Sequence, residues 1–436
     1  MSENSKLVKP DWLNGSAPDE VKFCEDFKEN HPIKSIGGRF YTVDGRVHDE
    51  NLLKKEIYDI LKPYISSGLS AKVNSLLELL RIHCCEEDFS MQLDRIHVAN
   101  GTLFLNGDFT EEKEFCRNRL PVSYDPTAPA PDRFLGFMAD LLDEEDILTL
   151  QEYLGYCLIP CTKAQKMMII LGNGGEGKSR LGLLMQRLLG EGVTMNSIQK
   201  IETNKFARAD LEGRLLMIDD DLEMTSMPKT SVTKTLVTAE APVDLERKGI
   251  QSYQGRLYAR FLCFGNGELT AANDHSFGFY RRQLVLYTKA PPADRRNDPF
   301  LVEKMVPELE GIFLWCFAGL QRLISNNFQF TVSAKAADSA RTVQTNVNTV
   351  EAFMGSTGYF DCVPEASTSC RVLYTVYRRF CEHNLFRPLN SRSFISQLHV
   401  LADKYDLTYS NNVYISKTVR VRGFTGIQVN SDTEHP

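Results

Sequence analysis

The chain has 436 residues, of which 42% are hydrophobic and 25% are charged, and this near-average composition excludes wholesale disorder, collagen and coiled coil. At roughly 100–200 residues per domain, the length predicts about two to four domains. Lys and Arg number 50 and Asp and Glu number 57, so the formal net charge of −7 excludes a protein coated all over with nucleic-acid-binding charge.

The N-terminal third mixes strand and helix patterns. Alternating segments around turn residues predict β-hairpins at 39–47 and 96–107. Apolar residues at helical spacing predict helices at 50–65 and 70–84. We expect residues 1–130 to form a mixed α/β accessory domain.

A Pro-rich stretch at 121–134 predicts a linker or extended strap, and the segment that follows it, 132–159, is predicted to be helical. Apolar strand-like runs then alternate with helical patterns, which favours an α/β core with buried parallel strands. The strand-like runs are 166–172, 213–221, 256–267 and 282–288, and the helices are 179–190 and 306–324. The last segment, about 345–430, is predicted as helix–helix–strand–strand, with 418–429 as a terminal hairpin.

The clearest chemical pattern follows the strand at 166–172. It fits GxxxxGK[ST] and consists of Gly172, Asn173, Gly174, Gly175, Glu176, Gly177, Lys178 and Ser179. Glycines allow backbone N–H groups to turn around a phosphate, and the start of the next helix adds its positive dipole end. The Lys178 ammonium can reach β- and γ-phosphates, and the Ser179 hydroxyl can ligate Mg²⁺. The pattern predicts a nucleotide-binding site.

An acidic strand end about forty residues downstream predicts the second half of that site. Four apolar residues are followed by Asp219, Asp220 and Asp221. We favour Asp219 for the metal and Asp220 for activation of water, with the distribution of roles among the three aspartates left open. A solvated acidic turn is the alternative.

Two further polar groups follow along the chain. Asn266 ends the next apolar strand between two glycines, where its amide can orient the attacking water or simply serve as a turn residue. Arg281 and Arg282 precede the strand at 282–288, and an arginine at such a place can act as a finger supplied in trans. We favour Arg281 for this role.

Together these elements resemble the superfamily 3 helicases within the AAA+ ATPases. The resemblance is closest to the helicase part of phage and plasmid primase-helicases, relatives of the poxvirus-type helicase-primase, without the primase domain. LGNGGEGKS resembles the Walker A motif of this family and LLMIDDD its Walker B motif. FLCFGNGEL resembles motif C, FYRRQLVLY the arginine-finger segment, and VLYTVYRRFCEHNLFRPLNSRSFISQLHVL a C-terminal winged-helix-like domain.

The resemblance implies an α/β fold with an AAA+ P-loop ATPase core. Residues 131–330 would form a helical collar plus the ATPase, and residues 345–430 a winged-helix-like DNA-binding domain. It also implies ATP and Mg²⁺ as cofactors and a homo-hexamer with ATP between subunits. Segment 234–254 resembles the part that bears the DNA-binding hairpin, so Arg247 and Lys248 become candidates for contacts with DNA in the central channel.

The expected function is therefore that of a ring-forming, ATP-dependent DNA helicase of phage or mobile-element replication. Its partners would be single-stranded and forked DNA, with a separate primase or replication initiator. One alternative is an origin-binding or loading ATPase that melts DNA without processive unwinding, and another is an AAA+ remodeller that does not act on DNA. Segment 371–422 carries nine Lys and Arg against three Asp and Glu, which favours docking on duplex DNA over a merely solvated helix face.

The cysteine and hydropathy patterns bear on location. Eleven cysteines include no CxxC pair and no zinc-type Cys/His spacing, so we expect reduced, mostly buried thiols. The first residues are polar, and no run approaches the roughly 20 apolar residues that span a bilayer. We expect a cytoplasmic protein, in a bacterial host or a virus-infected cell, with no membrane partner.

Overall fold

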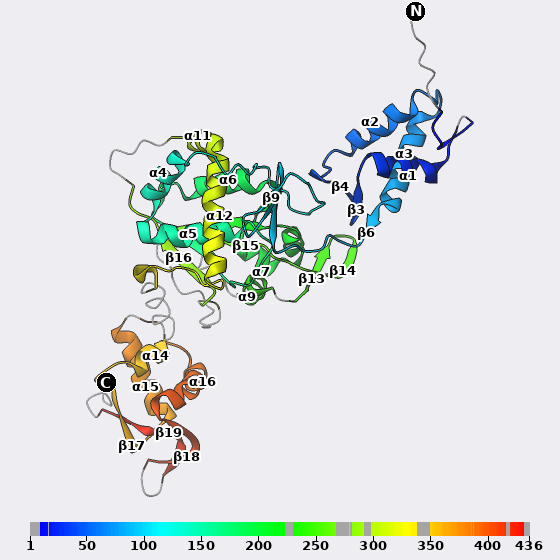
Figure 1. Ribbon diagram of the computed structural model, residues 1–436. Helices are drawn as coiled ribbons and strands as arrows, with labels where there is room; N and C mark the ends of the chain where they lie inside the picture. Colours follow the sequence, from blue (N-terminus) through cyan, green and yellow to red (C-terminus); the bar gives the residue numbers. More distant parts are fainter. Residues whose placement is uncertain are drawn as a thin grey trace, which may run out of the picture. The chain divides into compact units, whose positions relative to one another are not determined.

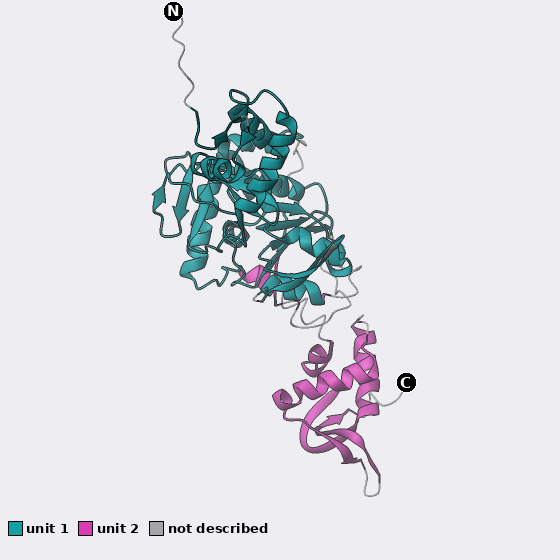
Figure 2. Ribbon diagram, turned by 90° about the vertical axis from the view of Figure 1, so that its right-hand side faces the viewer, with its two compact units in different colours: residues 1–222, 231–266, 286–332 teal, residues 223–230, 267–285, 333–436 magenta. Residues whose placement is uncertain are grey.

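The computed structural model describes residues 9–15, 17–222, 230–239, 241–266, 279, 281–291, 298–337, 349–384, 386, 388–415 and 419–430. Contacts divide the chain into two compact units (Figure 2). The first comprises Met1–Leu222, Ser231–Asn266 and Leu286–Val332. The second comprises Glu223–Thr230, Gly267–Val285 and Ser333–Pro436.

The first unit begins with a small α/β region that has a hydrophobic core of its own, built around Trp12, Phe23 and Leu76. Its helices are α1 (Glu20–Asn30), α2 (Glu50–Leu61) and α3 (Leu69–His83), and its strands are β1 (Leu13–Asn14), β2 (Ala17–Pro18), β3 (Lys34–Ile36), β4 (Arg39–Thr42), β5 (Gly45–Arg46) and β6 (Cys85–Glu86). The hairpin predicted at 39–47 and the helices predicted at 50–65 and 70–84 are confirmed. Helix α2 ends before Pro63, because the proline ring nitrogen has no N–H with which to continue the helical hydrogen bonds.

A second small sheet precedes the core. It has the order β7 (Arg95–Val98), β8 (Gly101–Phe104) and β9 (Phe109–Thr110), which confirms the hairpin predicted at 96–107. The Pro-rich stretch at 121–131 contains neither helix nor strand.

The helical segment predicted at 132–159 is two helices, α4 (Asp132–Leu141) and α5 (Glu144–Tyr156). The helix breaks at Leu142, whose backbone is extended, and α5 begins after Asp143. Asp143 occupies the N-cap position without a side-chain capping bond, and three acidic residues in the first turn of α5 suit its positive dipole end.

The central sheet, most of which belongs to the first unit, has the order β11 (Val193–Met195), β12 (Leu216–Asp219), β15 (Arg260–Asn266), β10 (Met167–Gly172) and β16 (Gln283–Tyr287). Figure 1 labels β15 and β16. The pairs β11–β12, β12–β15 and β10–β15 are parallel. Strands β10, β12 and β15 are almost wholly buried, as expected for a parallel sheet covered on both faces. The predicted α/β core with parallel strands is confirmed, although the short strand β11 was not predicted.

Helices cover this sheet and fill the connections. They are α6 (Lys178–Leu189), α7 (Ile198–Thr203), α8 (Lys205–Arg208), α9 (Ser231–Thr238), α11 (Leu301–Met305) and α12 (Leu309–Ser325), with 3-10 turns at Gly190–Gly192, Ala209–Leu211 and Val306–Glu308. Helix α12 packs directly on α5 (Figure 1). A Cβ at Gly155 would lie 2.2 Å from the carbonyl oxygen of Cys316, so this close packing requires glycine.

A β-hairpin projects between α9 and β15. It pairs β13 (Val243–Arg247) with β14 (Ile250–Gly255), and Arg247 lies opposite Ile250. The turn therefore consists of Lys248 and Gly249, and Gly249 has a φ of 75° that glycine adopts without strain.

The described part of the second unit contains α14 (Thr349–Met354), β17 (Phe360–Ser369), α15 (Cys370–His383), α16 (Ser391–Leu401), β18 (Thr408–Tyr414) and β19 (Arg420–Val429), with a 3-10 turn at Ala402–Tyr405. Its antiparallel sheet has the order β17-β19-β18, and its core is built around Phe353, Tyr377 and Phe394.

The predicted helix–helix–strand–strand order misses α14 and β17, and the hairpin predicted at 418–429 is wrong. Residues 420–429 are one strand that pairs with both neighbours. Gly423 lies inside this strand because a Cβ there would meet the carbonyl oxygen of Thr368 at 2.3 Å.

All eleven cysteines are free, and eight of them are buried, which confirms the expected burial of most thiols. Among the described residues, no helix has the length and hydropathy needed to cross a bilayer.

Candidate nucleotide-binding site

The glycine-rich loop joins β10 to α6 at the carboxyl edge of the sheet, where ligands of open α/β sheets bind. Gly174, Gly175 and Gly177 have φ angles of 102°, 85° and 101°, a conformation that other residues adopt only with strain. Helix α6 begins immediately afterwards, and no side chain caps its first turn. Its first N–H groups are therefore oriented to receive an anion.

Lys178 and Glu176 form an ion pair inside the loop. The Lys178 Nζ lies 2.8 Å from the Glu176 Oε2, and both side chains are less than 10% exposed. The other carboxylate oxygen of Glu176 accepts hydrogen bonds from the N–H groups of Asn173 and, at 2.8 Å, Gly174. Burial alone would raise the pKa of Glu176, but its bonds to Lys178 and to the backbone lower the pKa below the ordinary value. Glu176 is thus an internal anion of the loop.

The Gly172 position explains why the loop starts with glycine. A Cβ there would lie 2.3 Å from the Thr288 hydroxyl oxygen and 2.7 Å from a carboxylate oxygen of Glu176. The Thr288 N–H donates to the carbonyl of Leu171, so β10 and the segment after β16 are held together at this level.

Asn266 joins the loop from the neighbouring strand. In the parallel register of β10 and β15 it lies opposite Gly172, and its Oδ1 accepts a bond from Lys178 at 3.3 Å. The structure therefore brings Asn266 and Lys178 together, as the sequence analysis expected for parts of one site.

Asp219 ends β12 on the far side of β15 and is 4% exposed. Its two carboxylate oxygens accept the N–H groups of Ile198 at 2.8 Å and Asp221 at 3.3 Å. Burial is the largest influence on the pKa of Asp219 and raises it above the ordinary value of 3.8, with Asp221 and Asp220 adding repulsion. No Lys or Arg of the described chain pairs with Asp219.

This donor set fits a magnesium ion that arrives with a nucleotide. Each oxygen of Asp219 retains a lone pair, and a cation would offset the cost of burying its charge. The described residues contain no group of three or more His, Cys, Asp or Glu that could hold a metal by themselves. Mg²⁺ commonly takes one or two protein ligands and completes its shell with phosphate and water, so Ser179 and Asp219 would hold it together with the nucleotide.

The remaining predicted residues lie on the surface. Ser179, Asp220 and Asp221 are exposed, and Asp220 directly follows the buried Asp219. Arg281 is exposed in the turn before β16, and Arg282 is half-buried. Burial and the adjacent Arg281 lower the pKa of Arg282.

The two candidate DNA-binding residues differ in environment. Lys248 is exposed at the tip of the β13–β14 hairpin. The Arg247 guanidinium instead contacts the Glu212 carboxylate at 2.9 Å and the Tyr253 hydroxyl at 3.1 Å. Although Arg247 and Lys248 are adjacent in sequence, their side chains do not form one basic patch.

Sequence reasoning missed the role of the Glu176 side chain. The motif assigns this position only a backbone N–H, because its residue type varies within GxxxxGK[ST]. The available clue was a carboxylate two residues from the motif lysine.

Comparisons with known proteins agree with this core. Residues 170–282 match a family of unknown function (DUF5906). No curated protein sequence matches the chain. Two apo structures of the NrS-1 C terminal region (305–718) share the fold, with TM-scores of 0.57 and 0.55 at 9% and 10% identity. These matches cover 94% of this chain and 99% and 100% of those chains, so the likeness is one of overall fold.

Proposed function

We propose that the chain is an ATP-dependent DNA helicase of the superfamily 3 type, a ring-forming motor in phage or mobile-element replication. The observation that supports this most is the grouping of Lys178, Glu176 and Asn266 at the end of β10 and β15, with buried Asp219 at the end of β12. A cationic loop, an amide and an acidic strand end are the parts that an NTPase of this class needs.

In this proposal the phosphates of ATP take the place of Glu176 as the partner of Lys178. Lys178 and the N–H groups at the start of α6 hold the phosphates, while Asn266 orients the attacking water. Asp220, exposed beside the metal ligand Asp219, accepts the proton of that water. Mg²⁺ supplies neutralisation of the phosphate charge that develops during transfer.

The oligomer and the DNA contacts belong to the same proposal. Arg281 would complete the site of a neighbouring subunit in a homo-hexamer, because an arginine finger supplied in trans makes hydrolysis depend on the interface. Lys248 would contact the strand in the central channel, since it is exposed at a hairpin tip and can pair with phosphate.

The basic segment 371–422 of the second unit favours docking on duplex DNA as an accompanying activity. Asn390 caps the start of α16, and Arg392 is exposed in its first turn. Near the tip of the β18–β19 hairpin, the Arg420 guanidinium lies 4.4 Å from the centre of the Tyr414 ring. A helix and a hairpin with exposed cations can contact phosphates of a duplex.

The test uses a forked duplex with a single-stranded 3′ or 5′ tail. Unwinding in the presence of ATP is measured as the release of a labelled strand. We expect release that depends on hydrolysable ATP and disappears in Lys248→Ala but not in Lys55→Ala, an exposed lysine of α2. Local opening of an origin duplex without strand release would support the initiator alternative. ATP hydrolysis indifferent to DNA would support the remodeller.

A further inference from the structure

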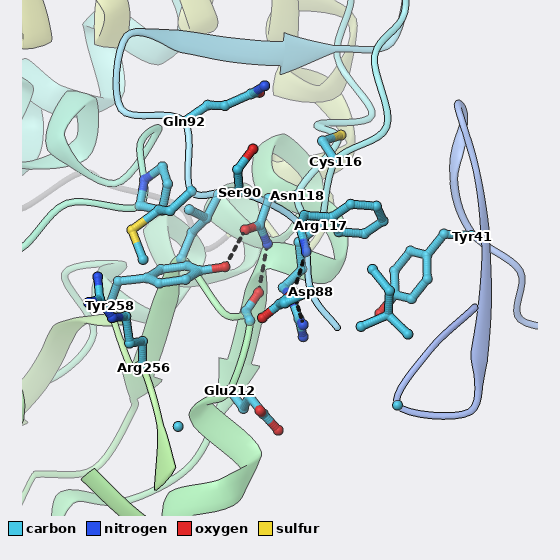
Figure 3. A pocket seen from close by; sticks show the side chains of 18 of the residues that line it. Tyr41, Asp88, Ser90, Gln92, Cys116, Arg117, Asn118, Glu212, Arg256 and Tyr258 are labelled. Atoms are coloured by element: carbon cyan, nitrogen blue, oxygen red, sulfur yellow. Dashed lines mark hydrogen bonds and ion pairs between the residues drawn. The ribbon is translucent and has the colours of Figure 1, made fainter. Parts of the chain in front are cut away.

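A cavity of about 820 Å³ lies in the first unit, away from the glycine-rich loop (Figure 3). Its walls come from several parts of the chain that are distant in sequence. They are the residues around β4, the segment 87–92, β7, the segments 116–118, 158–160 and 212–215, and the β13–β14 hairpin with the residues that follow it. Its volume lies within the range of roughly 300–1,000 Å³ that is typical of pockets enclosing small ligands. The hairpin that presents Lys248 at its tip is therefore also a wall of this cavity.

Arginines dominate the charge of the cavity. Three of them are neutralised within the described chain: Arg95 by Glu114 at 2.7 Å, Arg117 by Asp88 at 2.5 Å and Arg247 by Glu212 at 2.9 Å. Figure 3 shows the Arg117–Asp88 pair between the walls. These pairs fix the shape of the cavity rather than offering charge to a ligand.

Two other arginines retain their charge for a ligand. Arg39 on β4 and Arg256 after β14 are exposed, line the cavity, and form no ion pair or hydrogen bond with any residue that the structure describes. Glu87 is the one lining carboxylate of the described chain in the same condition. The cavity thus has an excess of positive charge from two parts of its lining, which favours an anion.

Flat and apolar side chains line the same cavity. Phe89 is half-buried, forms a T-shaped contact with Tyr41 at a ring-centre distance of 5.1 Å, and has Phe115 stacked parallel to it at 6.5 Å. Met91 lines the cavity and is 39% exposed. Tyr258 is fixed by a bond from its hydroxyl to Asn118 Oδ1 at 2.8 Å, as Figure 3 shows. A base can stack on the Phe89 ring while phosphates on either side meet the arginines.

We propose that this cavity binds nucleotides of a single nucleic-acid strand, with Arg39 and Arg256 contacting phosphates and Phe89 stacking on a base. The strand is favoured over a free nucleotide because the hairpin joins the cavity to Lys248, so one strand can run from the tip to the cavity. This inference rests on the proposed function, since it extends the DNA path of the same machine.

The test measures binding of a short fluorescent oligothymidylate to the full chain at several salt concentrations. The plot of log K against log salt has a negative slope, and each lost phosphate contact makes it less steep by about 0.7 for single strands. Arg39→Ala/Arg256→Ala should therefore reduce the steepness by about 1.4. The matched control is Arg133→Ala/Arg187→Ala, two exposed arginines outside the cavity, which should leave the slope unchanged. A cavity variant with the slope of the parent chain would overturn the proposal.

Two further experiments test whether Phe89 stacks on a base and whether the occupant is a strand or a free nucleotide. Phe89→Leu should weaken binding roughly tenfold without changing the slope, because stacking involves no counterion release, and unaltered affinity would refute the stacking role. Thymidine monophosphate should not displace the oligonucleotide, and displacement through Arg39 and Arg256 would mean that a free nucleotide is the occupant. If the parent chain binds no strand at all, the proposed function fails; if it binds and the arginine variant binds equally, only this inference fails.

Discussion

The glycine-rich loop and the acidic strand end both contain buried charges, but only the loop provides an ionic partner for its charge. In the loop, the Lys178 ammonium is neutralised by the Glu176 carboxylate and donates also to Asn266. At the end of β12, Asp219 is equally buried but receives only backbone N–H groups and has two further aspartates after it.

This difference indicates which partner each part needs. A buried cation with its own counter-ion keeps the empty loop stable, but that counter-ion competes with any phosphate. A buried carboxylate with a raised pKa and no cation gains from a metal ion and costs little to neutralise. The charge of the loop lysine is therefore neutralised internally, whereas the acidic strand end has no cationic partner among the described residues.

The largest effect is expected from removing the cation of the loop. Lys178→Ala should abolish ATP hydrolysis and lower the free energy of unfolding by about 3 kcal/mol, because it leaves the Glu176 carboxylate buried without its ammonium partner. Thermal unfolding and phosphate release measure the two effects. The double variant Lys178→Ala/Glu176→Gln should regain most of the stability and none of the hydrolysis. A double variant no more stable than the single one would refute the internal neutralisation.

Neutralising the acidic strand end should separate stability from activity. Asp219→Asn should change the thermal midpoint of the nucleotide-free protein only slightly, because removal of a buried charge offsets the loss of one of the two N–H bonds that the carboxylate accepts. Mg²⁺-dependent hydrolysis should nevertheless fall by roughly 10² or more, because the metal loses a ligand worth several kcal/mol in the transition state. Activity equal to that of the parent chain across a magnesium titration would contradict the assignment, and Asp220 and Asp221 would then be the next residues to test.

The smallest effect concerns the counter-ion itself. Glu176→Gln should bind ADP about tenfold more tightly, because Lys178 no longer has to leave a charged partner. The pKa of Glu176 is lowered in the folded chain, so the stability from its charge is present above its ordinary pKa of 4.5 and is lost as pH falls through the lowered value. Calorimetry of ADP binding and thermal midpoints between pH 3 and 7 check both points. Two results would count against competition between Glu176 and phosphate for Lys178. One is weaker ADP binding by Glu176→Gln, and the other is a difference in thermal midpoint between Glu176→Gln and the parent chain that grows at low pH.

Local patterns predicted correctly the strand ends that carry the candidate residues. The run of apolar residues before Asp219 and the glycines before Lys178 each define a strand end by themselves, and parallel strands bring such ends to one edge. The pairing of Lys178 with Asn266, 88 residues apart, follows from this edge and from the register of β10 and β15.

Features that depend on distant contacts were beyond the sequence. Arg247 and Lys248 were expected to act together, but the two-residue turn leaves Arg247 in the hairpin ladder, where it contacts Glu212, 35 residues earlier. Strand β17 has mostly exposed or half-exposed residues, so it lacks the apolar pattern of a buried strand. The cavity could likewise not be predicted from the sequence, because the segments that line it lie far apart along the chain.

The account is tested most directly by the rate of ATP hydrolysis of the full chain, with and without single-stranded DNA, at saturating Mg²⁺. We predict magnesium-dependent hydrolysis that rises several-fold when the strand is added and vanishes in Lys178→Ala. Absence of hydrolysis under both conditions, or a rate that Lys178→Ala leaves intact, would contradict the assignment of the glycine-rich loop and the acidic strand end to one ATPase site.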